Sequence, residues 1–183
     1  MPKRNRKLLS AIITLIGMPS AGKTKVGRRL AEILSIDFVD TDEQVVATMG
    51  TEKENLCAIV GRLSPKEFAI AEEAIAIHTL IGLRRPTVIA TSGSMVYSDR
   101  AMDMLRRGSF IVYLRATLET IQRRVAKRPD RGLVLAPGET LNDLFKRREP
   151  LYEKWAWHTV DSDGNRNHLA EKLASELLAK KIV

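Results

Sequence analysis

The sequence of 183 residues lacks the features on which disulfide-bonded and membrane-spanning proteins depend. It has a single cysteine, Cys57, which excludes an intrachain disulfide and a metal site built from several thiolates. No apolar run approaches the roughly 20 residues that would span a bilayer. Hydrophobic residues make up 44% of the chain and charged residues 28%, which is ordinary for a globular protein. We therefore expect one cytoplasmic domain with no membrane association.

Aromatic residues are also scarce, at 5%, whereas basic residues exceed acidic ones. The 30 lysines and arginines against 22 acidic residues give a net charge of +8 and a pI near 9.8. Such a charge favours an anionic partner, either nucleic acid or a small molecule that carries phosphate or carboxylate groups. Because aromatic stacking surfaces and the known nucleic-acid-binding motifs are lacking, we expect the small molecule and not nucleic acid.

The first 24 residues admit two interpretations. A basic start, an apolar run and the stretch GMPSAGKT are compatible with a secretory leader, or with a strand followed by a phosphate-binding loop. Cleavage near Ala21 would remove the first candidate strand and cut through the strongest motif of the chain. We therefore favour the strand and the loop.

Short apolar runs alternate with longer amphipathic segments along the whole chain. This alternation predicts an α/β domain with a mainly parallel sheet, because buried parallel strands are short and continuously apolar. The candidate strands are residues 11–16, 36–40, 87–91, 110–114 and 158–161.

Several helices have recognisable starts. Ser64, Pro65 and Glu67 form a capping-box pattern, which predicts a helix from residue 64 toward residue 84. Ser98 and Thr117 are candidate N-caps of two further helices. We also expect helices over residues 25–34 and 168–181, the last with leucines at helical spacing.

The stretch from Gly17 to Thr24 satisfies the pattern G-x-x-x-x-G-K-[ST] in full. The two glycines of the motif, Gly17 and Gly22, allow successive backbone N–H groups to turn toward phosphate oxygens. Lys23 supplies a cation, Thr24 offers a hydroxyl to Mg²⁺, and the helix that follows points its N-terminus at the same anion. The motif therefore predicts a nucleotide-binding loop.

Polar residues follow two further candidate strands. Asp40 and Asp42 lie where the second strand should end, at the edge of the sheet where open α/β folds bind ligands. One carboxylate could serve a metal and the other a substrate hydroxyl, or the two could be a helix cap and a solvated side chain. Gly93 follows the third strand and allows either a close approach to a ligand or an ordinary turn.

Residues 128–138, RPDRGLVLAPG, contain glycines and prolines around two arginines, which predicts a mobile loop. Further arginines flank the segment. Phosphoryl transfer gathers negative charge, and guanidinium groups that arrive on closure stabilise this charge and exclude water. We therefore expect a lid over about residues 124–138.

Taken in order, six stretches resemble the shikimate kinase family over nearly the whole chain. They are GMPSAGKTKVGRRLAEIL, FVDTDEQV, VIATSGS, RGLV, RREPLYEKWA and VDSDG. The resemblance implies a three-layer P-loop kinase fold, with a five-stranded parallel sheet flanked by helices, and a substrate-binding helical region over about residues 43–84. It also implies transfer of the γ-phosphoryl group of ATP, with Mg²⁺, to a hydroxyl group of shikimate.

The resemblance further implies roles for single residues. The catalytic residues would be Lys23, Asp42 and Arg131. The acceptor would be bound by Asp42, which orients or deprotonates its hydroxyl, by Gly93, and by Arg148 at its carboxylate. Mg²⁺ would be bound by Thr24 and Asp40. The nucleotide would be bound by Gly17, Ser20, Ala21, Gly22, Lys23, Thr24, Lys25 and Arg124, and Arg128 is a rival to Arg131 as the lid arginine.

The sequence departs from the family pattern at three places. The family's Gly-Gly-Gly turn is Ser92-Gly93-Ser94, and Gly132 stands where the family has proline. Ala69 stands where the family has an arginine that binds the substrate carboxylate, although the neighbouring glutamate remains as Glu72. Either Arg62 or Lys66 replaces that arginine, or the acceptor needs no second cation.

Three functions therefore stay open. The chain is expected to be a monomeric shikimate kinase. The alternatives are a related kinase that acts on another hydroxy acid or a polyol, and a nucleotide-binding regulator without turnover. The carboxylate of Asp42 argues against the regulator, since a nucleotide sensor needs no acceptor-side carboxylate.

Overall fold

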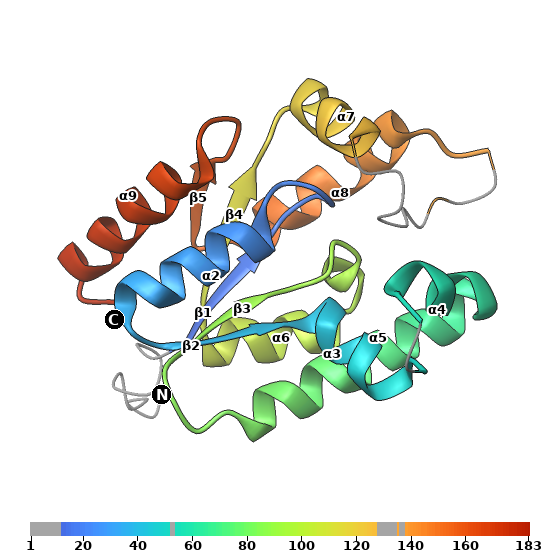
Figure 1. Ribbon diagram of the computed structural model, residues 1–183, viewed down its shortest axis with the longest axis horizontal. Helices are drawn as coiled ribbons and strands as arrows, with labels where there is room; N and C mark the ends of the chain where they lie inside the picture. Colours follow the sequence, from blue (N-terminus) through green and yellow to red (C-terminus); the bar gives the residue numbers. More distant parts are fainter. Residues whose placement is uncertain (1–11, 52–53, 128–134, 136–137) are drawn as a thin grey trace.

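The computed structural model describes residues 12–51, 54–127, 135 and 138–183 (Figure 1). Five strands form one parallel sheet in the order β2-β3-β1-β4-β5. The strands are β1 (Ile12–Ile16), β2 (Asp37–Asp40), β3 (Thr87–Ala90), β4 (Phe110–Arg115) and β5 (His158–Asp161). The predicted α/β fold with a five-stranded parallel sheet is confirmed, and each strand differs from its prediction by no more than one residue at either end. Of the predicted strand residues, Ala11 alone lies outside the described chain.

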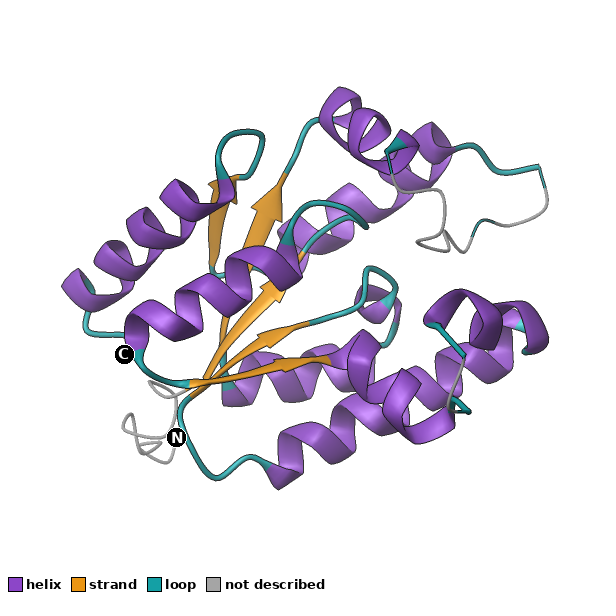
Figure 2. Cartoon of the chain, viewed as in Figure 1, coloured by secondary structure: helices purple, strands orange, loops and turns teal. Residues whose placement is uncertain are grey.

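Helices cover both faces of the sheet and complete the three layers (Figure 2). Helices α2 and α9 pack against each other on one face, and α5 and α6 pack against each other on the opposite face. The helices are α2 (Lys23–Leu34), α3 (Thr41–Met49), α4 (Leu56–Arg62), α5 (Pro65–Gly82), α6 (Asp99–Gly108), α7 (Leu118–Ala126), α8 (Leu141–Trp155) and α9 (Arg166–Ala179), with the 3₁₀ turn η1 (Met95–Tyr97).

The predicted helix starts are confirmed where a capping side chain marks them. The amide of Ser64 donates to Glu67 Oε2 at 2.9 Å, and the Ser64 hydroxyl accepts from the Glu67 amide, which completes the capping box of α5. The hydroxyls of Ser98 and Thr117 cap α6 and α7 by accepting from the amides of Ala101 and Thr120, without the reciprocal bond of the capping box. Helix α9 begins two residues earlier than predicted, because Asn165 caps it.

Helix α8 was not predicted from the sequence. It contains Pro150, which reads locally as a helix breaker. A capping box between Thr140 and Asp143 starts the helix, and the fully buried Tyr152 stacks on Tyr113 of β4 with ring centroids 5.1 Å apart. Tertiary packing therefore stabilises a helix that local propensity disfavours.

The buried residues that the structure describes form two separate hydrophobic clusters. The larger one contains the sheet and most helices, and residues 13–16 of β1 are fully buried because both faces of the sheet are covered. The smaller one joins α3, α4 and α5 through Val45, Ile59 and Phe68. The predicted substrate-binding region thus has a small core of its own. In the part of the chain that the structure describes, no helix is long and apolar enough to cross a membrane.

Candidate active site

A cavity of about 580 Å³ opens at the edge of the sheet where β1, β2 and β3 end. Because all strands are parallel, the segments that follow them meet at this one edge. Eight of the predicted site residues line the cavity: Ser20, Gly22, Lys23, Thr24, Asp40, Asp42, Gly93 and Arg148. A smaller cavity of about 170 Å³ adjoins it and is lined by residues that include Ser20, Gly22, Thr24, Lys25 and Arg124.

At Gly17, the loop between β1 and α2 has a backbone conformation that only glycine adopts readily. Gly17 has a φ of 146°, and a Cβ atom there would lie 2.7 Å from the carbonyl oxygen of Leu114. The buried Lys23 places its Nζ inside the loop, where it donates to the carbonyl oxygens of Gly17 at 2.7 Å and Met18 at 3.0 Å. The loop therefore presents a fixed cation and the N-terminus of α2 to the cavity, which suits an anionic phosphate.

Thr24 and Asp40 meet across the start of α2 and the end of β2. The Thr24 hydroxyl donates to Asp40 Oδ2 at 2.7 Å, and Asp40 Oδ1 accepts from the Asp42 amide at 2.9 Å. Asp40 is thus the N-cap of α3, as the alternative interpretation held, and its second oxygen remains directed at Thr24. A hydroxyl and a carboxylate side by side are hard oxygen donors of the kind that Mg²⁺ binds together with substrate phosphates.

Arg148 of α8 reaches the opposite side of the cavity and is 4% exposed. Its Nε donates to the hydroxyl of Tyr97 at 3.1 Å, and its guanidinium lies 5.1 Å from the centre of the Tyr97 ring. A Cβ atom on Gly93 would lie 3.0 Å from Arg148 Nη1 and 2.9 Å from Pro19. Gly93 is therefore required by the close approach of two neighbouring side chains, and Tyr152 fixes its turn by donating to the Gly93 carbonyl at 2.8 Å.

Arg124 of α7 connects the loop to the segment after β5. It donates to the carbonyl oxygens of Ala21 at 3.0 Å and Ser162 at 2.6 Å. Burial lowers the pKa of Arg124, and the neighbouring charge of Arg166 lowers it further. Two guanidinium groups therefore lie beside the smaller cavity and make it electropositive, which suits an anionic ligand.

Glu72 of α5 and Ser94 of the turn after β3 face each other in the wall of the main cavity. Ser94 Oγ donates to Glu72 Oε1 at 2.8 Å, and Glu72 is 4% exposed. Burial raises the pKa of Glu72, whereas the hydroxyls of Ser92 and Ser94 and the charges of Arg148 and Lys23 act in the opposite direction.

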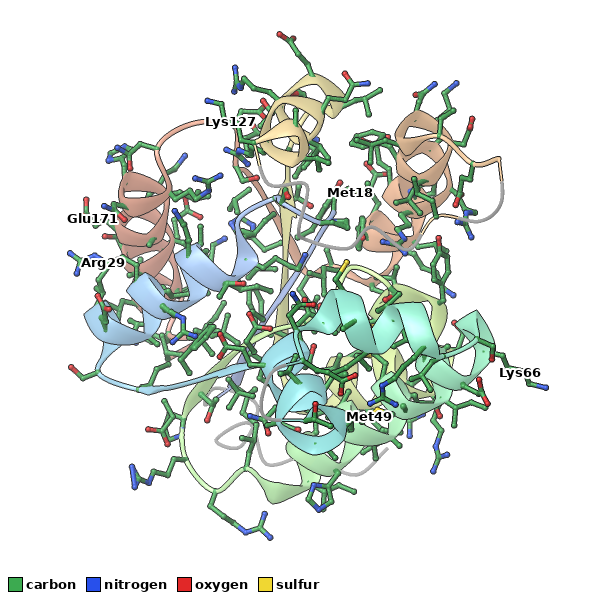
Figure 3. All side chains as sticks on the ribbon, turned by 45° about the vertical axis from the view of Figure 1, so that its right-hand side comes forward. Met18, Arg29, Met49, Lys66, Lys127 and Glu171 are labelled. Carbon is green, nitrogen blue, oxygen red and sulfur yellow. The ribbon has the colours of Figure 1, made fainter. Side chains whose placement is uncertain are left out.

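Neither cation expected to compensate for Ala69 lies beside Arg148. Arg62 donates from its Nε to Glu54 at 3.1 Å and from its Nη2 to the Met49 carbonyl at 2.6 Å. Lys66 projects from the outer side of α5 away from the cavity (Figure 3). Among the described residues, Arg148 is the arginine that lines the cavity. Of the two alternatives that Ala69 left open, the structure therefore contradicts replacement by Arg62 or Lys66.

The remaining site predictions divide between the described and the undescribed residues. Gly17 and Ala21 are buried within the loop. Arg128, Arg131 and Gly132, and most of the predicted lid, lie outside the described residues. The sequence reading gave no role to Ser94 or Tyr97, because nothing local to either residue indicates the partner it meets in the fold.

The fold and the two adjoining cavities define the class of this protein, a P-loop kinase in which a phosphate-binding loop faces a cavity for a small acceptor. Residues 19–180 match the family model described as shikimate kinase. The chain therefore belongs to the shikimate kinase family, whose members are ATP-dependent kinases that phosphorylate shikimate.

Individual relatives agree with this assignment. The shikimate kinase of Thermodesulfovibrio yellowstonii is 35% identical over 167 residues, covering 90% of this chain and 93% of the relative. That of Nitrosospira multiformis is 34% identical over 169 residues, covering 90% of this chain and 84% of the relative. The solved shikimate kinase from Acinetobacter baumannii in complex with shikimate matches with a TM-score of 0.83 and 28% identity, over 97% of this chain and 99% of that chain.

Proposed function

We propose that this protein transfers the γ-phosphoryl group of ATP to a hydroxyl group of shikimate and forms shikimate 3-phosphate. The observation that supports this best is that Lys23 of the phosphate-binding loop and Asp42, a carboxylate on the acceptor side, line one cavity together with Arg148. A phosphoryl group held at Lys23 and a hydroxyl group held at Asp42 would therefore be neighbours, as direct transfer requires.

Each of these side chains has a separate task in the proposed reaction. The oxygen of the acceptor hydroxyl bonds to the γ-phosphorus while the bond from that phosphorus to the ADP oxygen breaks. Asp42 orients the hydroxyl and accepts its proton. Lys23 stabilises the negative charge on the phosphoryl oxygens, and Arg148 binds the acceptor carboxylate.

Thr24 and Asp40 are the residues that would bind Mg²⁺. The metal supplies positive charge to the phosphate oxygens when it is bound. On the other side of the loop, Ser20, Gly22, Lys25 and Arg124 would contact the nucleotide in the smaller cavity. Arg131, with Arg128 as the alternative, stays a proposal for the arginine that closes over the phosphates.

A second candidate is a related kinase that acts on another hydroxy acid or on a polyol. Ala69 favours it, since the carboxylate of the acceptor would meet one arginine in the described part of the cavity and not two. We further infer a monomer that acts in the cytoplasm, where ATP is available.

The test is an assay of the purified chain with Mg·ATP and, in turn, shikimate, quinate and gluconate. The expected result is shikimate-dependent release of ADP, with a phosphorylated shikimate identified by mass spectrometry. Phosphorylation of gluconate or quinate in preference to shikimate would replace the proposal with the second candidate. ATP hydrolysis that no acceptor stimulates would remove acceptor phosphorylation altogether.

A further inference from the structure

One wall of the acceptor cavity consists of polar side chains without a cationic partner. Glu72 comes from α5 and Ser94 from the turn after β3, and Ser94 Oγ donates to Glu72 Oε1 at 2.8 Å. Within the described ranges, Glu72 has no lysine, arginine or histidine nitrogen within 4.0 Å. A buried carboxyl group of this kind takes its hydrogen bonds from neutral donors, here a serine hydroxyl.

The position of Ala69 explains why the hydrogen-bond donor to Glu72 in this wall is uncharged. Ala69 is exposed on α5, three residues before Glu72, so the two positions lie on neighbouring turns of one helix face. Alanine supplies no donor to Glu72 from there. The serine that follows Gly93 supplies one instead, from the turn after β3.

This wall favours hydroxyl groups and disfavours carboxylates. A hydroxyl group of the acceptor can donate its proton to Glu72 or to a lone pair of Ser94 Oγ, whose own proton is directed at Glu72. A second carboxylate beside Glu72 would bring two like charges together in a site that is largely removed from water. The acceptor carboxylate is therefore directed to Arg148, whose guanidinium is held on the ring and the hydroxyl of Tyr97.

We propose that Ser94 determines acceptor specificity: together with Glu72 it binds a ring hydroxyl of the acceptor that is not phosphorylated, while Arg148 alone binds the acceptor carboxylate. This inference rests on the proposed function, since it specifies how the same cavity holds shikimate. Ser94 departs from the Gly-Gly-Gly turn of the family. The proposed acceptor selectivity is therefore a property of this chain and not of the family pattern.

The test measures binding of three ligands to the full chain in the presence of Mg·ADP by calorimetry. The ligands are shikimate and its deoxy analogues that lack the 4- or the 5-hydroxyl group. We expect the wild type to bind one deoxy analogue about tenfold more weakly than shikimate, since a hydrogen bond to a buried carboxyl group is lost. In Ser94→Ala this ratio should fall to about twofold.

Two further variants control the measurement. Ser175 of α9 is the control, because its hydroxyl donates to the Glu171 carbonyl oxygen outside the cavity, and Ser175→Ala should keep the wild-type ratio. Glu72→Gln keeps the size of the side chain and should reduce the ratio as Ser94→Ala does. Glu72→Gln therefore tests the same change in the affinity ratio if Ser94→Ala folds poorly.

The outcomes separate this inference from the proposed function. An unchanged ratio in Ser94→Ala, or an equal weakening of all three ligands, would overturn the inference while wild-type turnover of shikimate leaves the proposed function standing. A wild type that neither binds nor phosphorylates shikimate would remove the proposed function and the inference with it.

Discussion

The phosphate-binding loop and the acceptor wall share one cavity and are built in different ways. The loop is made of consecutive residues, and its shape follows from backbone conformation, with Gly17 at a φ of 146° against the Leu114 carbonyl. The acceptor wall is assembled from side chains of α3, α4, α5, α8 and the turn after β3. The loop matches its sequence pattern fully, whereas each departure from the family pattern that the structure describes lies in the acceptor wall or beside it.

The two regions also differ in the core that supports them. The loop follows β1, whose residues 13–16 are fully buried within the sheet. The acceptor region rests partly on the small cluster of Val45, Ile59 and Phe68. Few buried contacts correspond to a lower free energy of local opening. The difference indicates that phosphoryl chemistry is fixed by the central sheet, while acceptor binding can change through single side chains.

The largest expected effect is on the loop side, in Lys23→Ala. Removing the ammonium that stabilises the phosphoryl oxygens should reduce kcat about 10³-fold or more and leave the fold intact. The assay is ADP release with Mg·ATP and shikimate, with circular dichroism to check folding. The matched control is Arg29→Ala, which removes a charge from the middle of α2, where Arg29 pairs with Glu171 (Figure 3). Wild-type turnover in Lys23→Ala would contradict the role of the loop.

On the acceptor side of the same cavity, Asp42→Asn should reduce kcat on the order of 10²-fold and change the affinity for Mg·ATP little. Asp42 is proposed to face the acceptor hydroxyl, so its loss should affect the chemical step. Asp40→Asn is the contrasting variant and should mainly weaken Mg·ATP binding, because Asp40 meets Thr24. Equal losses of kcat and nucleotide affinity in Asp42→Asn would place this carboxylate on the metal instead.

Ala69→Arg should lower the KM for shikimate by about tenfold by adding a second cation for its carboxylate. Ala69 is exposed, so the longer side chain needs no space in the core. Steady-state kinetics at saturating ATP would measure the change, and Ala74→Arg, at another exposed position of α5, is the control for added charge. An unchanged KM would show that Arg148 suffices for the carboxylate.

A smaller effect is expected for Tyr97, which positions Arg148. Tyr97→Phe loses the hydrogen bond from Arg148 Nε and keeps the ring, so the KM for shikimate should rise about two- to fivefold with kcat unchanged. Tyr97→Leu also loses the ring and should raise the KM further. A change in kcat or in the KM for ATP would point to a general structural role.

The smallest effect concerns stability and Glu72. Burial raises the pKa of Glu72, so its protonated form contributes stability that is complete below about pH 4.5 and is lost as pH rises through the folded-state pKa. Glu72→Gln, which is neutral at all pH values, should therefore gain thermal stability over wild type at neutral pH, and this gain should disappear toward pH 4.

Glu67→Gln is the control with the opposite sign for the stability measurement. The hydroxyl and amide of Ser64 hold the pKa of Glu67 below its ordinary value, so its contribution is present at neutral pH and is lost in acid. Thermal unfolding at a series of pH values compares both variants with wild type. A Glu72→Gln difference that is independent of pH would contradict the raised pKa.

Much of the fold was predictable because its signals are local. Buried parallel strands such as β1 and β4 appear as short apolar runs, and caps such as Ser64 stand beside the helix that they start. The loop was predictable for the same reason, since its residues are consecutive. Helix α8 was not predicted, because Pro150 disfavours a helix locally and the stacking of Tyr152 on Tyr113 outweighs it only in the folded chain.

The sequence by itself determined the nucleotide side of this protein, from the loop at residues 17–24 to the carboxylates at the end of β2, and showed that an expected arginine is absent at Ala69. Only the tertiary structure decided what stands in its place. Ser94 and Glu72 are 22 residues apart, and Arg148 and Tyr97 are 51 residues apart. Such contacts depend on how α5, α8 and β3 pack together, and no pattern of neighbouring residues encodes them.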